Sequence, residues 1–496
     1  MKRAFSVFLN PLSKRDLLLL AAATLTAGLI YIAASYFKYR VGFPLDDSWI
    51  HQTFARNLAQ HGEWSFRAGV PSAGSTSPLW SALLALGFLF GLAPYIWAYF
   101  LGLLVMWGLS IVSEITARRL VKDYRPRFPW VGLFIIAEWH LLWAAMSGME
   151  TLLHGLIITL VLSALMMNSR RYLTLGLLTG LSVWVRPDGL TLLAPLVLAV
   201  ILFEADTSSR LRGLLRVLIG FGAVFLFYIF FNLIIGGTPM PNTFYAKQAE
   251  YAAWQQLPIA YRLGELSLQL LVGPSFLLIP GVILWTIRSI RARSWGSLLA
   301  LTWSLGYMIL YMLRLPMYQH GRYIMPAMPI FFLLGLLAVL DFSASKTGTF
   351  GRYQWFVKTL WLASLSTVTF LFIVLGARSY SNDVALIEQE MVDTARWVNT
   401  NLPPDALMAV HDIGAIGYFS QQPIIDLAGL VSPEVVPFIR DEARLSDYLN
   451  RQGVDYLIAF ADFYPEMTAN RDVVFVTNGA VATESDFTRM TIYRWK

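Results

Sequence analysis

The sequence predicts an α-helical, polytopic membrane protein of about 11 transmembrane helices, followed by a small α/β domain outside the membrane. Three observations predict this fold class. The chain of 496 residues is 56% hydrophobic and only 14% charged. Apolar runs of roughly 17 to 23 residues recur along it, and each can cross about 30 Å of hydrocarbon at about 1.5 Å per residue. Beyond residue 380 these runs stop, and helix-like segments alternate with short strand-like ones.

Basic residues between the apolar runs predict the topology, because cytoplasmic loops are enriched in lysine and arginine. The first run, Leu17 to Phe37, is longer than the apolar core of a signal peptide, so we expect an uncleaved anchor with a cytoplasmic N-terminus. The basic residues lie in the N-terminal segment (Lys2, Arg3, Lys14, Arg15) and in the connections 118–127, 170–171, 210–216, 288–293 and 346–358.

With the basic connections placed in the cytoplasm, the apolar runs after residue 118 alternate regularly across the membrane. The segment 78–117 must then cross the membrane only once, because it has to end at the cytoplasmic connection 118–127. We expect residues 95–117 to span and Pro78 to Phe90 to form a juxtamembrane or half-inserted helix on the outer side. The C-terminus is expected outside. The predicted spans are 17–37, 95–117, 129–147, 150–168, 171–185, 189–203, 213–235, 268–288, 297–314, 322–341 and 355–377.

Two domains follow from this topology: a transmembrane domain over residues 1–379, whose first outer loop is 38–94, and an extracytoplasmic α/β domain over 380–496. In the second domain we expect a helix at 384–399 and strands at 407–411, 424–427 and 456–460.

Several classes of function are excluded by composition and motifs. The chain has no cysteine, so it forms no disulfide and no thiolate metal site. Its net charge of +7 is explained by the cytoplasmic loops, and no nucleic-acid partner is expected. No P-loop or GxGxxG pattern follows a strand-like run, so no nucleotide site is predicted.

Adjacent carboxylates at Asp46 and Asp47 follow the first span, where burial of charge is costly. One of them can cap the amphipathic helix predicted from Ser48 to His61, which Gly62 ends. The pair can instead supply a general base and a partner acid, or hold Mg²⁺ or Mn²⁺. His51 lies one helical turn beyond Asp47, either as a third polar ligand or as a solvated side chain.

Cations at span ends on the outer face are the next candidates, since the insertion bias disfavours them there. Arg322, Lys247 and Arg186 either reach towards lipid head groups or line a pocket for an anionic group, for which the guanidinium fork of Arg322 is best suited. His320 can donate to the same anion. Asp188 is expected to pair with Arg186. Glu150 either caps the following span or joins the acidic site.

The motifs that carry these residues occur in the order LDDSWIH, GSTSPLW, SGMET, VRPDG, PNTFYAK and HGRYIMPAMP. Together they resemble the GT-C superfamily of integral membrane glycosyltransferases, most of all bacterial arabinofuranosyltransferase and mannosyltransferase types, and more distantly the aminoarabinose transferases and protein O-mannosyltransferases. The likeness covers residues 15–380 and extends to HDIGAIGYFSQQPIIDLAGLVSPE in the C-terminal domain.

The resemblance implies a bacterial inner-membrane enzyme that transfers a sugar, with inversion, from a polyprenyl phosphate to a hydroxyl of an extracytoplasmic glycan, lipid or protein. It implies that Asp46 is the general base and Asp47 its partner. The donor phosphate is expected at Arg322, Lys247, His320 and Arg186, and the substrate at His51, Glu150, Asn242 and Tyr245. Two other functions are considered: a transporter or flippase of lipid-linked sugars, and a membrane receptor or scaffold whose tail binds glycan.

Overall fold

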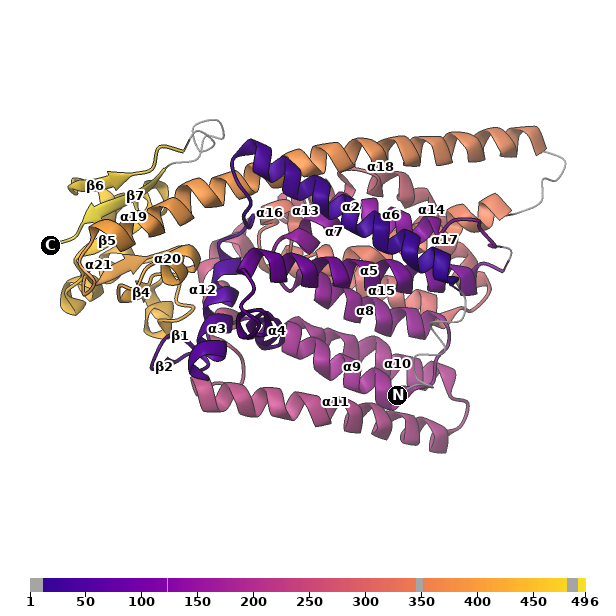
Figure 1. Ribbon diagram of the computed structural model, residues 1–496. Helices are drawn as coiled ribbons and strands as arrows, with labels where there is room; N and C mark the ends of the chain where they lie inside the picture. The colour runs from indigo at the N-terminus through magenta and orange to yellow at the C-terminus, as the bar shows by residue number, and fades with distance from the viewer. Residues whose placement is uncertain (1–11, 123, 345–350, 480–488) are drawn as a thin grey trace.

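The computed structural model describes residues 12–122, 124–344, 351–479 and 489–496, and it contains a bundle of long helices with a small α/β domain at one end (Figure 1). The predicted fold class, a helical membrane protein with a small C-terminal α/β domain, is confirmed. Lys2, Arg3 and Lys346, which contributed to the predicted topology, lie outside the described residues.

Six helical segments within the described residues are long and apolar enough to cross a membrane, or seven if one bent pair is counted. The bent pair is α13 (Ile259–Leu271) and α14 (Ser275–Arg291), whose axes differ by 98°. Four of the six segments are single helices: α2 (Lys14–Lys38), α5 (Pro94–Leu120), α11 (Thr207–Gly236) and α15 (Trp295–Arg314). The fifth, Tyr318–Ser343, consists of α16 (Tyr318–Gly321), η3 (Met325–Ala327) and most of α17 (Met328–Ala344). The sixth, Trp355–Asn401, consists of most of α18 (Gly351–Ile387), η4 (Glu388–Val392) and α19 (Asp393–Asn401).

The other predicted spans coincide with shorter or interrupted helices, so the count of 11 stays a prediction. The run 129–147 is interrupted because Glu138 is extended and its carboxylate accepts a 3.1 Å hydrogen bond from the Leu141 N–H, which starts a new helix. The shorter elements are α6 (Trp130–Ala137), α7 (Trp139–Met146), α8 (Thr151–Met166), α9 (Tyr172–Val185), η1 (Pro187–Leu192) and α10 (Leu193–Phe203).

Apolar side chains cover the outer faces of the peripheral helices. Leu25 on α2, Phe227 on α11 and Phe370 on α18 are 56%, 69% and 71% exposed. By contrast, 94% of the apolar window within Tyr318–Ser343 is buried inside the protein. Exposed apolar faces on the peripheral helices, together with a buried apolar segment, are what a lipid environment requires, so the chain is a multi-pass membrane protein.

Short helices gather at the end of the bundle that carries the α/β domain (Figure 1). The first loop predicted to lie outside the membrane, 38–94, forms α3 (Asp47–His61), a hairpin of β1 (Ser65–Arg67) and β2 (Val70–Pro71), and α4 (Pro78–Leu89). With 12 residues, α4 is too short to cross, and it packs against α3 and α5. The second outer loop adds α12 (Asn242–Glu250) and η2 (Ala252–Gln256).

The C-terminal domain is built on a five-stranded sheet of order β4-β3-β5-β7-β6. All three predicted strands are present, as β3 (Met408–Val410), β4 (Ile424–Asp426) and β5 (Tyr456–Phe460), which are mutually parallel. The boundary expected at residue 380 falls inside α18, so a helix continues from the bundle into this domain. The remaining elements are α20 (Ile413–Phe419), η5 (Pro433–Phe438), α21 (Glu442–Gln452), η6 (Ala461–Phe463), α22 (Pro465–Thr468), β6 (Val473–Val476) and β7 (Met490–Arg494).

Candidate active site

Asp46 immediately precedes α3 and joins the first outer loop to the C-terminal domain. It occupies the N-cap position of α3, but its side chain makes no capping hydrogen bond to that helix. Its carboxylate instead accepts hydrogen bonds from the backbone N–H groups of Gly414 (2.6 Å) and Ala415 (2.8 Å) at the start of α20. A Cβ at Gly414 would overlap the Asp46 backbone, so this approach requires glycine. Asp46 therefore contacts the N-terminus of a helix, but in the other domain.

The acidity of Asp46 is set by opposing effects. Burial, followed by the nearby Asp412 carboxylate, raises the pKa of Asp46 to about 8, although the two backbone hydrogen bonds act in the opposite direction. The carboxyl group of Asp46 therefore exchanges its proton near neutral pH.

Asp47 turns its side chain towards the cations of the bundle. Its Oδ2 accepts a 2.7 Å hydrogen bond from Nη2 of Arg322 and lies 3.9 Å from Nζ of Lys247. Burial alone would raise the pKa of Asp47, but the charges of Arg322 and Lys247 together lower it well below its usual value. Asp47 is therefore ionised at neutral pH, and its side chain is 30% exposed.

Three cations surround the ring of Tyr323. The Arg322 and Arg186 guanidinium carbons lie 4.9 Å and 5.7 Å from the ring centroid, and Lys247 Nζ lies 5.5 Å from it. Nε and Nη1 of Arg322 are buried and have no hydrogen-bond partner among the described residues. Buried donors on a permanent cation are costly to leave unpaired, so this cluster is suited to an anionic ligand.

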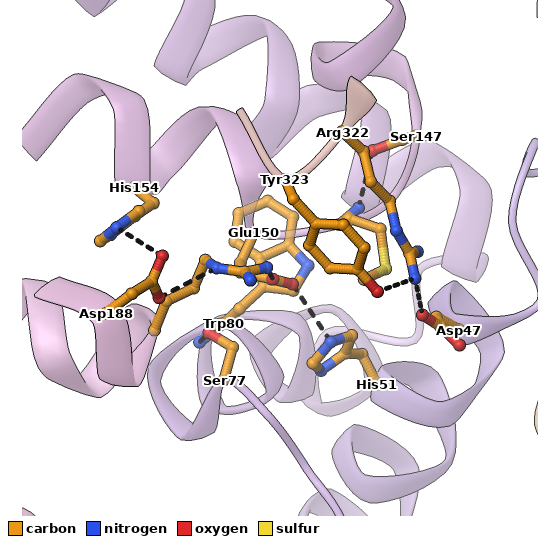
Figure 2. Close-up of polar contacts among 12 residues, drawn as sticks. Asp47, His51, Ser77, Trp80, Ser147, Glu150, His154, Asp188, Arg322 and Tyr323 are labelled. Carbon is orange, nitrogen blue, oxygen red and sulfur yellow. Dashed lines mark hydrogen bonds and ion pairs between the residues drawn. The ribbon is translucent and has the colours of Figure 1, made fainter. Parts of the chain in front are cut away.

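A buried polar chain extends from α3 into the bundle (Figure 2). His51 Nε2 lies 3.2 Å from Glu150, and Arg186 Nη1 donates a 2.8 Å hydrogen bond to Glu150 Oε1. Arg186 also pairs with Asp188 at 3.2 Å, as the sequence predicted, and His154 Nε2 lies 3.6 Å from Asp188. Glu150 thus joins His51 to the cation cluster, and its side chain makes no capping hydrogen bond to α8.

The cation cluster lies beside a cavity of about 470 Å³. Arg186, Lys247 and Tyr323 form part of its wall. Apolar side chains form much of the rest: Leu190, Met240, Phe244, Leu310 and Leu315. A smaller cavity shared by Asp47, His51, Thr243 and Lys247 adjoins it. The arrangement combines an apolar chamber with cations and an ionised carboxylate.

An unusual turn carries Arg322. Gln319, His320 and Gly321 have φ values of 52°, 59° and 69°, so two non-glycine residues are left-handed in succession. The turn directs His320 away from the cations: its Nε2 lies 2.8 Å from Asp383 Oδ2, and its ring contacts Trp143. The structure therefore does not bring His320 to the group predicted to bind phosphate.

Asn242 and Tyr245 do not line the 470 Å³ cavity. Asn242 is buried at the start of α12, where its backbone N–H donates a 3.0 Å hydrogen bond to the Ala73 carbonyl. Tyr245 is 37% exposed and packs on Phe244. Both therefore support the loop and do not reach the cations.

The acidic pair does not fit the predicted Mg²⁺ or Mn²⁺ site. Asp46 faces backbone N–H donors and Asp47 faces Arg322, so the two carboxylates diverge. Within the described ranges no group of three His, Asp or Glu side chains is arranged to hold a metal ion. A divalent cation would compete with Arg322 and Lys247 for Asp47.

Sequence reasoning missed Tyr323 and the hydroxyls of Tyr307 and Tyr311, which both donate to Asp188. Tyr307 and Tyr311 are spaced by one helical turn on α15, which was a detectable signal. His411 and Asp412 were also not among the predicted site residues. They follow β3, at the carboxyl end of a parallel strand.

Comparisons with known proteins identify the fold. Residues 382–493 match a family described as a domain of unknown function (DUF8728), and no curated protein matches the sequence. ArnT from Cupriavidus metallidurans superimposes with a TM-score of 0.59 bound to undecaprenyl phosphate and 0.60 in the apo state. Both are 16% identical over 97% of this chain, and the match covers 98% and 97% of those chains.

A second similar structure is the Archaeoglobus fulgidus oligosaccharyltransferase in the apo form. Its TM-score is 0.57, at 10% identity over 89% of this chain and 70% of that chain. At such identities the similarity is one of fold. The fold that these structures share with this chain agrees with the fold expected from the sequence resemblance.

Proposed function

We propose that this chain is an inverting glycosyltransferase that moves a sugar from a polyprenyl phosphate to an acceptor hydroxyl outside the membrane. The observation that carries the proposal is the position of Asp47 beside Arg322 and Lys247, next to the apolar 470 Å³ cavity. Among the structures with a similar fold, one ArnT structure was solved bound to undecaprenyl phosphate. That ligand joins an apolar chain to a phosphate, which matches an apolar cavity beside a cluster of cations.

The donor phosphate is assigned to Arg322, Lys247 and Arg186. Two Arg322 nitrogens lack partners among the described residues, and a guanidinium can bind two phosphate oxygens at once. Negative charge grows on the phosphate as its bond to the sugar breaks, and fixed cations stabilise that charge without reorganising. The first isoprene units would lie along the apolar wall formed by Leu190, Phe244 and Leu310.

We propose Asp47 as the general base, where the sequence resemblance suggested Asp46. Asp47 is ionised and partly exposed, and it lines the small cavity that adjoins the apolar one, whereas both oxygens of Asp46 already accept backbone hydrogen bonds. Asp47 takes the proton of the acceptor hydroxyl while that oxygen forms a bond to the anomeric carbon. The bond between that carbon and the phosphate oxygen breaks on the opposite face, which inverts the configuration, and the polyprenyl phosphate leaves.

Purified full-length protein in nanodiscs tests this function. Mass spectrometry of copurifying lipid identifies the donor, and that species is then supplied with labelled sugar. We expect release of polyprenyl phosphate that depends on Asp47. Movement of labelled lipid between leaflets of proteoliposomes without sugar transfer would overturn the proposal in favour of a flippase.

A further inference from the structure

A second cavity, of about 780 Å³, lies between the second outer loop and the C-terminal domain. Glu250 and Tyr251 line it from the end of α12, and Tyr318 lines it from α16. Asp412 and Phe463 line it from the C-terminal domain. Because three separate segments form its walls, the cavity exists only when the C-terminal domain is seated on the bundle.

The polar wall of this cavity contains an unused acceptor. Oδ2 of Asp412 is buried and has no hydrogen-bond partner among the described residues. Its neighbours are already engaged: Glu250 lies 3.5 Å from His411 Nε2 and 3.6 Å from Arg440 Nη2. A buried carboxylate oxygen without a donor favours a ligand that brings hydroxyl groups.

Aromatic side chains supply the apolar part of the lining. Tyr318 and Phe463 are 58% and 46% exposed, and the Phe463 ring packs edge-on against His411 at 5.1 Å. Exposed rings next to carboxylates form a site with flat apolar surfaces and hydrogen-bond acceptors, which is how a polyol with apolar ring faces is bound.

Asp412 also links this cavity electrostatically to the proposed catalytic base. Burial, followed by the charges of Asp47 and Glu250, raises the pKa of Asp412 to about 7, so Asp412 lies within electrostatic range of Asp47. Asp47 itself lines the small cavity that shares Thr243 and Lys247 with the apolar one. An acceptor bound in the C-terminal cavity would therefore lie near the base.

Building on the function proposed above, we propose that the 780 Å³ cavity binds a carbohydrate acceptor, with Asp412 accepting hydrogen bonds from its hydroxyls and Phe463 packing on a sugar ring. The acceptor is then a glycan and not a protein side chain or a lipid head group. The C-terminal domain supplies the groups that select it, while the bundle holds the donor.

Glycan binding can be measured without any donor. Fluorescently labelled full-length protein in nanodiscs is applied to printed arabinan, mannan, galactan and glucan oligosaccharides. We expect at least one class to bind, and we expect Asp412→Asn and Phe463→Ala each to weaken that binding about tenfold or more. Asp405→Asn and Val473→Ala change exposed residues of the same domain outside the cavity and should bind as the wild type does.

Two results would overturn the assignment: binding to none of the printed glycans, or equal binding by the cavity variants and the wild type. Donor turnover separates this inference from the proposed function. Arg322→Ala should lose release of polyprenyl phosphate and keep glycan binding. If wild-type protein binds glycans but never releases polyprenyl phosphate, the glycosyltransferase proposal fails while the cavity assignment stands.

Discussion

Arg322 and Asp47 are joined by a 2.7 Å hydrogen bond between Nη2 and Oδ2, which links the turn before α17 to the start of α3. The bond uses one guanidinium nitrogen, and Nε and Nη1 have no partner among the described residues. One arginine can therefore keep the carboxylate ionised and bind an anion at the same time. In the proposed reaction, the base and the leaving group are held by the same side chain.

Replacing Asp47 by asparagine should lower turnover by about 10² to 10⁴-fold, the usual contribution of a general base. The asparagine amide is nearly the same size, and Asp47 is at the first position of α3 with its side chain partly exposed, so we expect the protein to stay folded. Release of polyprenyl phosphate in nanodiscs and elution on size exclusion measure the two effects.

Asp46→Asn is the matched control for that variant, because it changes the adjacent carboxylate. We expect Asp46→Asn to retain measurable turnover. If Asp46→Asn is inactive with its C-terminal domain still seated, and Asp47→Asn is active, the base is Asp46, as the sequence resemblance implied.

Substitution of Arg322 tests the anion site. Arg322→Lys keeps the charge but loses the fork, so we expect polyprenyl-phosphate affinity to fall about tenfold, and about 100-fold in Arg322→Ala. Binding of undecaprenyl phosphate to protein in nanodiscs measures this by titration. Arg451→Ala, an exposed site on α21, is the control and should bind normally. Equal affinity for undecaprenyl phosphate in Arg322→Ala and the wild type would show that the phosphate does not bind at this cation cluster.

The gathering of polar motifs at one end of the bundle could be predicted, because loop charges and span lengths fix which residues lie near the same surface. Arg186, Lys247 and Asp47 were reached in this way. The direction of each side chain could not be predicted. Whether Asp46 or Asp47 faces the cations depends on α20, which is more than 350 residues further along the chain.

The interruptions within the predicted spans could not be predicted from hydropathy either. A window average treats 129–147 as one apolar run, yet a buried carboxylate at Glu138 captures the Leu141 N–H and the His140 ring and starts a second helix. The same limit applies to His320, which the motif placed beside Arg322. Two left-handed residues in the turn send it to Asp383 instead, and no periodicity reveals such a conformation.

The seating of the C-terminal domain should depend on pH through Asp46 and Asp412. The pKa values of both are raised, to about 8 and about 7, mainly by burial. A folded-state pKa above the unfolded one adds stability that is present at low pH and is lost as pH rises through the folded value. The contact between α20 and α3 should therefore weaken as pH rises from about 4 to about 8 and change little above that.

Hydrogen exchange of the Gly414 and Ala415 amides, corrected for intrinsic rates, measures this change. Asp412→Asn removes the neighbouring charge, so protection should persist to higher pH, whereas Asp405→Asn should follow the wild type. Constant protection from pH 5 to 9 in the wild type would contradict the prediction.

Loss of Glu150 should destabilise the bundle more than it affects substrate affinity. Glu150 is fully buried between His51 and Arg186, and these two partners offset the burial of its charge. In Glu150→Gln the buried charge of Arg186 loses one of its carboxylate partners. Breaking a buried ion pair in this way should lower the free energy of unfolding by about 3 kcal/mol. Thermal unfolding in nanodiscs should show a lower Tm, and Glu466→Gln, at an exposed position on α22, should not. In a double-mutant cycle, Arg186→Met should add less to Glu150→Gln than to the wild type, because the partner is already gone. Additive losses would mean that the two residues act independently, and the chain from His51 to Asp188 would not be one unit.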